Sequence, residues 1–127
     1  MSNPGYKRLT VALAIACLGL AVSSGFFLYR YQLLSIRVFW ACQQSVEFHA
    51  TRLHALRSDA ATAAWRLKNL VVVYPSLIRK DTNSPLDKMV AGERAFAVRG
   101  IIEYLRARTG EDLGENPEPW IQKYCPN

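Results

Sequence analysis

Residues Leu9–Tyr29 read LTVALAIACLGLAVSSGFFLY, a run of 21 residues that contains no charged side chain. A helix needs about 20 apolar residues to cross the hydrocarbon core of a bilayer, so this run is long enough to span a membrane. Basic residues flank both of its ends, and Tyr29 and Tyr31 suit the interface between lipid and water. The run therefore predicts a single-pass transmembrane helix at residues 9–29, preceded by a short tail at residues 1–8.

Two other interpretations of this run stay open. A cleaved signal peptide would also begin with basic residues, and the small residues before Gly25 are typical of a cleavage site. In the other interpretation Cys17 carries a lipid anchor, which would leave the apolar residues 18–29 without a role. We favour the retained anchor because the run is long enough to span.

The charges that flank the span bear on its orientation. Two basic residues precede the run and Arg30 and Arg37 follow it, so the charge bias across the membrane is nearly balanced. A first helix with a short tail usually inserts as a signal anchor. We therefore expect the residues after the span to lie outside the cytosol.

The rest of the chain has the composition of a small folded domain. The 127 residues carry a net charge of +6, half of them are apolar, and only three are cysteines. These values exclude a disordered polar tail, a collagen-like chain and a disulfide-dense secreted scaffold. Just under 100 residues follow position 30, which is enough for a small helical core.

Residues 30–74 predict a long helix that continues the span. No proline lies between Pro4 and Pro75, and apolar residues recur at alternating spacings of three and four, the pattern of one helix face. Ser58-Asp59 could start a new helix, but the pattern keeps its phase there, so we expect continuity. We expect this face to pack on the chain's own last helix, with a coiled coil to a second copy as the alternative. The face, here called the seam, consists of Phe39, Cys42, Val46, His49, Leu53, Leu56, Ala60, Ala63, Leu67, Leu70 and Tyr74.

A second helix is predicted from Pro85 to about Arg108. Ser84 is a suitable N-cap before a proline at the first helical position, and Gly110 suits the end of the helix. Its expected apolar face consists of Leu86, Met89, Val90, Phe96, Ala97, Ile101 and Leu105.

The two predicted helices form an antiparallel hairpin with a C-terminal strap. Tyr74-Pro75 ends the first helix, and residues 76–84 form a polar connector. Residues 111–127 contain three prolines and are expected to dock on the hairpin as a strap. The docking residues of the strap, on one short helical turn, are Trp120, Ile121 and Tyr124.

No motif in the sequence supports catalysis. His49 and His54, the only histidines, lie five positions apart, about 140° around a helix, so they cannot share a metal as an i, i+4 pair would. A glycine-rich phosphate loop, a CxxC pair and an HExxH motif are absent. The acidic residues between positions 111 and 118 do not have the spacing of a calcium loop. We therefore expect a protein that is not an enzyme and has no metal or cofactor.

The most specific string is Ile101–Tyr124, which reads IIEYLRARTGEDLGENPEPWIQKY. It resembles a C-terminal pattern of poorly characterised bacterial membrane-anchored or exported proteins, in which a helix precedes Thr-Gly, an acidic residue, glycine, Asp-Pro or Asn-Pro, and tryptophan. Residues of this chain that occupy the pattern are Thr109, Gly110, Asp112, Gly114, Asn116, Pro117 and Trp120. Further matches begin near Tyr74-Pro75-Ser76, although the glycine expected after them is missing. The resemblance covers about residues 70–124 and implies no catalytic residue.

The residues of this pattern are suited to structural roles. Gly110 can cap a helix, Gly114 permits a tight turn, and Pro117 starts a turn that presents Trp120. These four, together with two aromatic residues beyond the span, are the expected structural or interaction residues. The two aromatic residues are Phe39 and Trp40.

The cysteines offer one further structural hypothesis. Cys42 and Cys125 could form a disulfide bond if they face an oxidising compartment. Sequence alone does not fix the directions of their Cβ atoms, so three free thiols remain the alternative. Cys17, within the span, is expected to stay a free thiol.

Together these features predict an all-α protein in four parts. The parts are a tail at 1–8, a transmembrane helix at 9–29, a membrane-proximal stalk at 30–58, and a small head with its strap at 59–127. We expect a non-catalytic accessory or scaffolding subunit of a larger complex in a bacterial inner membrane, with the head outside the cytosol. The alternative is a membrane-tethered binding or sensory module that recognises a peptide, a cell-wall component or a lipid.

The expected partners follow from the anchor and the charge distribution. Membrane lipid is one partner, and the other is a larger membrane protein complex or a second copy joined through the long helix. The basic residues after position 50 alternate with acidic ones and form no reading motif, so we expect no nucleic acid. No small-molecule substrate is expected.

Overall fold

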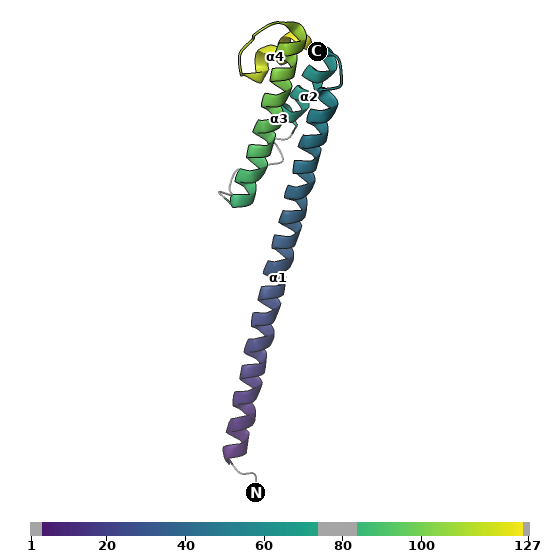
Figure 1. Cartoon of the computed structure of the whole chain (residues 1–127). Helices are drawn as coiled ribbons and strands as arrows, with labels where there is room; N and C mark the ends of the chain where they lie inside the picture. The colour runs from purple at the N-terminus through teal and green to yellow at the C-terminus, as the bar shows by residue number, and fades with distance from the viewer. Residues whose placement is uncertain (1–3, 74–83, 126–127) are drawn as a thin grey trace. The chain divides into compact units, whose positions relative to one another are not determined.

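The computed structural model describes residues 4–73 and 84–125, and every regular element in these ranges is a helix. The helices are α1 (Pro4–Ala55), α2 (Ala60–Val72), α3 (Pro85–Thr109) and α4 (Pro117–Tyr124), all labelled in Figure 1. The fold is therefore all-α, as the sequence predicts. The expected helix end at Tyr74-Pro75 and nearly all of the expected connector lie outside the described residues.

The chain divides into two compact units, Met1–Phe39 and Trp40–Asn127. In the first unit the described side chains are exposed, and those between positions 9 and 29 are mostly apolar. α1 is long and apolar enough to cross a membrane, judged by its length and composition. α1 is therefore a candidate for the single transmembrane helix that the sequence predicts. The second unit, Trp40–Asn127, is called the folded unit below.

The first helix ends at Ala55, so the expectation of one unbroken helix is wrong. The Ser58 hydroxyl and backbone N–H both donate to the Ala55 carbonyl, at 2.9 and 3.1 Å, and close a turn. Asp59 then caps α2, because its carboxylate accepts a bond of 3.3 Å from the backbone N–H of Thr62. Tyr104 of α3 donates its hydroxyl to the Ser58 carbonyl and secures the turn. The expectation of one helix rested on the spacing of apolar residues, which carries no information about these polar contacts.

In the folded unit, α1 buries a different face from the seam. The seam residues of this stretch are exposed, and they are Cys42, Val46, His49 and Leu53. The residues of α1 that are buried instead are Ala41, Phe48, Thr51 and Ala55. Phe48 is 1% exposed, and its ring removes more apolar surface from water than a valine or leucine would. In α2 the seam is the buried face, as predicted, since Ala63, Leu67 and Leu70 are buried.

α3 begins and ends where the sequence predicts. The Ser84 hydroxyl accepts from the backbone N–H of Asp87 at the start, and Gly110 closes the end with a φ of 73°. The buried face differs in part from the expected one, since Met89 and Phe96 are 47% and 50% exposed. The buried residues of α3 are Val90, Ala97, Gly100, Ile101, Ile102 and Leu105.

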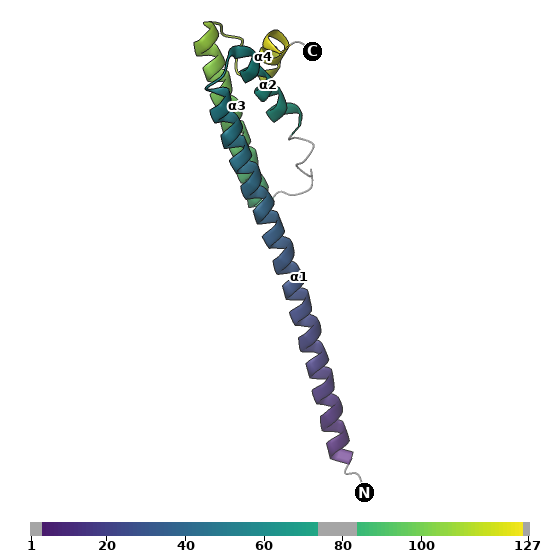
Figure 2. The ribbon, with the colours of Figure 1, turned by 90° about the vertical axis from the view of Figure 1, so that its right-hand side faces the viewer.

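Alanine forms a large share of the core of the folded unit. Because its side chain is a single methyl group, helix backbones that meet at alanine can approach closely. The alanine residues buried among the larger core side chains are Ala41, Ala55, Ala63, Ala64 and Ala97. Figure 2 shows the last turns of α1 beside α3 in this unit.

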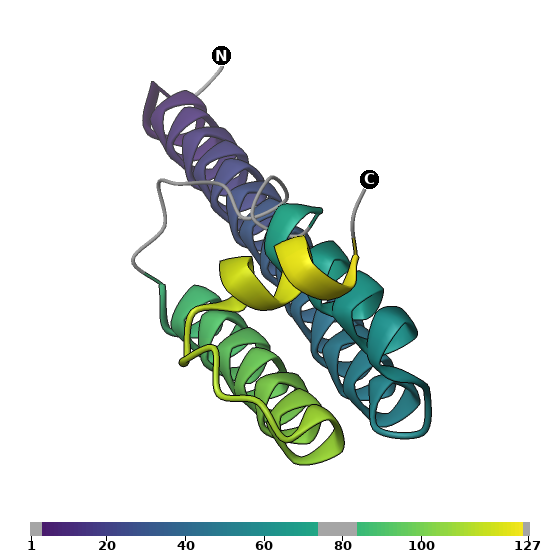
Figure 3. The ribbon, with the colours of Figure 1, turned by 90° about the horizontal axis from the view of Figure 1, so that it is seen from above.

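α4 packs on both α2 and α3 (Figure 3). Trp120 is fully buried, and its indole N–H donates to the Gly114 carbonyl at 2.9 Å. Its ring stacks on Tyr124 with 6.2 Å between ring centroids. Gly114 has a φ of 86°, and Pro117 begins α4 directly after the N-cap Asn116. These residues fix the tail on the core.

The proposed pairing of Cys42 with Cys125 is not formed, because all three cysteines are free thiols. Cys42 is exposed on α1. Cys125 follows α4, which is docked on α2 and α3, and it packs against the core instead.

Candidate functional site

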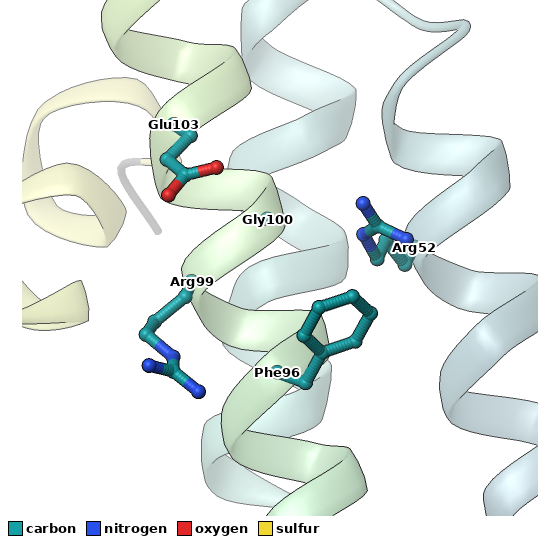
Figure 4. Close-up of a pocket in the computed structure, with 5 residues that line it drawn as sticks. All are labelled: Arg52, Phe96, Arg99, Gly100 and Glu103. Atoms are coloured by element: carbon teal, nitrogen blue, oxygen red, sulfur yellow. The ribbon is translucent and has the colours of Figure 1, made fainter.

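A pocket of about 210 Å³ opens in the folded unit between the last turns of α1 and the middle of α3 (Figure 4). One of its lining residues, Arg52, comes from α1, and the other four come from α3. The full lining is Arg52, Phe96, Arg99, Gly100 and Glu103.

The helix period places the α3 residues on one side. Phe96, Gly100 and Glu103 follow each other at spacings of four and three, which is one helix face, and Arg99 lies beside them. Arg52 lies next to the buried Thr51 on the side of α1 that enters the core. The packing of α1 on α3 thus brings a cation of one helix to an aromatic face of the other.

The position of the Arg52 side chain is defined by two neighbours. Its guanidinium carbon lies 4.6 Å from the centroid of the Phe96 ring, the geometry of a cation–π contact. Gly100, one turn further along the same face of α3, also faces Arg52: an added Cβ there would lie only 3.1 Å from Arg52 Cδ and 3.2 Å from Cζ. Arg52 Nε is buried, and among the described residues it has no hydrogen-bond partner. The contacts described for the Arg52 side chain are therefore packing contacts with α3.

The lining carries a net charge of +1, from two arginines and one glutamate. Arg99 and Glu103 are exposed, and within the described residues neither forms an ion pair within 4.0 Å. Their charges are therefore available to a bound group.

A second, smaller hollow of about 40 Å³ lies beside α3. It shares Arg99 and Glu103 with the pocket and adds Arg106, which makes an ion pair of 2.9 Å with Asp112. The charged surface of the pocket therefore extends toward the C-terminal end of α3.

The acidic turn after α3 is occupied by internal contacts. Glu111 accepts from Lys123 Nζ at 2.6 and 2.7 Å and from the Tyr124 hydroxyl at 2.6 Å. Lys123, and then Tyr124, hold the pKa of the Glu111 carboxyl below its ordinary value, and Glu111 in turn raises the pKa of Lys123. The Gly114 N–H, and then Arg106, lower the pKa of Asp112. These carboxylates fasten the tail to α3 and α4.

The residues expected from sequence to have structural or interaction roles lie away from the pocket. Gly110, Gly114, Pro117 and Trp120 hold the tail around the end of α3. Phe39 and Trp40 are 63% and 56% exposed on α1, one in each unit.

Sequence reasoning missed Arg52, Arg99 and Glu103. One available signal is Gly100, a glycine inside a helix, since such a residue costs helix stability unless a close neighbour requires it. A second is Phe96, an aromatic residue on the same face as the charged Glu103.

No known protein family, characterised protein or solved structure matches the chain. The arginines of the pocket can attract an anion and donate hydrogen bonds, and the Phe96 ring offers an apolar contact.

Proposed function

We propose that the protein is a single-pass, non-catalytic accessory or scaffolding subunit of a larger bacterial membrane complex. The observation that carries this proposal is the exposure of large aromatic side chains on the folded unit. Trp40, Trp65 and Phe96 are 56%, 50% and 50% exposed. Exposed aromatic residues are enriched where proteins bind one another, and tryptophan is prominent among the residues that dominate binding energy.

The span supports the membrane part of the proposal. α1 has the length and composition to cross a bilayer, and its side chains between positions 9 and 29 are exposed, as contact with lipid requires. We propose an inner-membrane location with the folded unit outside the cytosol.

Purification in mild detergent tests the subunit hypothesis. Size-exclusion chromatography and mass spectrometry should recover the full chain with a partner in fixed stoichiometry. Trp65→Ala should lower the recovery of the partner, whereas Thr62→Ala, at an exposed position of the same helix, should not. A lone monomer of the unmodified chain would contradict the proposal.

Cys42 offers a test of the orientation, because it is a free and exposed thiol of the folded unit. A membrane-impermeant maleimide should label it in intact spheroplasts, and Cys42→Ser should remove that label. Labelling that requires permeabilised membranes would place the folded unit in the cytosol.

A membrane-tethered binding or sensory module is the second candidate, favoured by the open pocket beside Arg52. Such a module would bind a peptide, a cell-wall component or a lipid reversibly. It would then elute without a stoichiometric partner, so the same chromatography separates the two functions.

A further inference from the structure

We infer that the pocket lined by Arg52, Phe96, Arg99, Gly100 and Glu103 binds a carboxylate, supplied by an acidic side chain of the partner protein. This inference rests on the proposed function, because a partner must provide the acidic residue. It adds the chemistry by which the partner is recognised.

The first argument is the preorganisation of Arg52. Phe96 and Gly100, one turn apart on α3, pack against its side chain, and its Nε has no hydrogen-bond partner among the described residues. A planar guanidinium group binds a carboxylate through two parallel N–H···O bonds. Because the group is already held, less conformational entropy is lost when those bonds form. Because Nε is buried, the two bonds to a carboxylate would form at the terminal N–H groups of Arg52.

The second argument is the balance of charge. A carboxylate with one negative charge neutralises the net charge of +1 in the lining. A phosphate carries more negative charge and would face repulsion from Glu103. Glu103 can instead accept a hydrogen bond from a backbone N–H next to the acidic residue of the partner. The lining therefore favours a carboxylate within a peptide over a phosphate.

The third argument is the shape and surface of the pocket. A volume of about 210 Å³ holds a side chain with its methylene groups as well as its two oxygens. The half-exposed Phe96 ring offers these methylenes an apolar contact. Arg99 also lines the pocket and adds a second positive charge. A glutamate or aspartate side chain matches all three features.

The experiment uses the full chain in detergent and a capped pentapeptide, acetyl-Gly-Leu-Glu-Leu-Gly-amide, with the central glutamate replaced by glutamine as the matched probe. Isothermal titration calorimetry should show binding of the glutamate peptide at least about tenfold tighter than that of the glutamine peptide. Added salt should weaken the binding, since it depends on opposite charges. Equal binding of the two peptides, or no binding of either, would overturn the inference.

Substitutions at and near the pocket test whether the peptide binds there. Arg52→Gln should weaken binding of the glutamate peptide at least about tenfold, and Arg52→Lys, which keeps the charge without the planar fork, should weaken it less. Gly100→Ala should act like Arg52→Gln, because the new Cβ displaces the Arg52 side chain. Arg57→Gln, at an exposed arginine in the turn after α1, is the matched control and should bind normally. Unchanged binding by Arg52→Gln would overturn the assignment, and thermal unfolding followed by circular dichroism confirms that each variant is folded.

Two competitors identify the chemistry and its source. Inorganic phosphate should displace the peptide less effectively than acetate at equal ionic strength, and the reverse order would overturn the assignment to a carboxylate. Free glutamate that binds as tightly as the peptide would overturn a protein partner as the source. Recovery of a stable complex without any effect of Arg52 refutes this inference alone, whereas a lone monomer that binds the peptide through Arg52 refutes the proposed function alone.

Discussion

Arg94 of α3 donates from Nε to the carbonyl oxygen of Leu70 at 2.8 Å and reaches the next carbonyl, that of Val71, at 3.2 Å. Both carbonyls belong to the end of α2, where the last C=O groups of a helix have no partner within the helix. A positive charge there also interacts favourably with the helix dipole. One side chain therefore caps a helix to which it does not belong and ties α2 to α3.

Arg94→Ala should lower the free energy of unfolding by about 1.5–3 kcal/mol, the usual contribution of hydrogen bonds to a charged group. Arg94→Lys should recover part of this, since an ammonium group keeps the charge but not the two-pronged geometry. Urea unfolding of the full chain in detergent measures the change. Lys88→Ala, at an exposed position of the same helix, is the control, and equal effects of the two alanine variants would contradict the capping role.

Trp120→Ala should cost about 3–5 kcal/mol, because a large buried aromatic side chain leaves a cavity that the core fills only partly. Trp120→Phe keeps most of the apolar surface but loses the bond to the Gly114 carbonyl, so its cost should be smaller. Thermal unfolding followed by circular dichroism tests both variants. If Trp120→Ala melts at the unmodified temperature while partner recovery fails, Trp120 serves an interface instead of the core.

Two glycines should respond in opposite directions to alanine. Gly114 has a φ of 86°, where a Cβ is strained, so Gly114→Ala should destabilise the fold by about 1–2 kcal/mol. Gly92 lies inside α3 with open space around it, so Gly92→Ala should stabilise the fold by about 0.5–1 kcal/mol. Urea unfolding gives both values, and a shared sign would show that backbone conformation does not determine the outcome.

The contacts of Glu111 should make stability depend on pH at both ends of the range. Its pKa lies below the ordinary 4.5 in the folded state, so its contribution is present above pH 4.5 and is lost as the pH falls through the lowered pKa. The pKa of Lys123 is raised above 10.5, so the same contact is lost as the pH rises through that raised value. The difference in stability between the unmodified chain and Glu111→Gln should thus be greatest between these limits. Urea unfolding across pH measures it, and a difference that persists unchanged in strong acid would rule out the ionised contact.

Local signals in the sequence predict the ends of α3 and the candidate span. Ser84, followed by proline, and Gly110 mark the two ends of α3, because capping depends on residues next to the helix end. The uncharged run at residues 9–29 identifies the candidate span for a similar reason, since length and composition are themselves the physical requirement.

The buried face of α1 and the pocket depend on contacts between distant residues. Val46 and Phe48 are both apolar, and the packing of the core cluster buries Phe48 and leaves Val46 exposed. Arg52 meets Phe96 because α1 packs on α3, and no spacing within either helix encodes that meeting. The free thiols of Cys42 and Cys125 have the same origin, because the docking of α4 decides where the tail lies.

The alanine residues of the core determine how this protein can diverge. At Ala55, Ala63 and Ala64, each fully buried, a larger side chain would push packed helices apart at a cost of about 1–3 kcal/mol. A domain of this size has only about 5–15 kcal/mol of stability, so few such changes are tolerated together. In homologous proteins these positions should drift only among alanine, glycine and serine. The exposed positions around Trp65, by contrast, can change without disturbing the core.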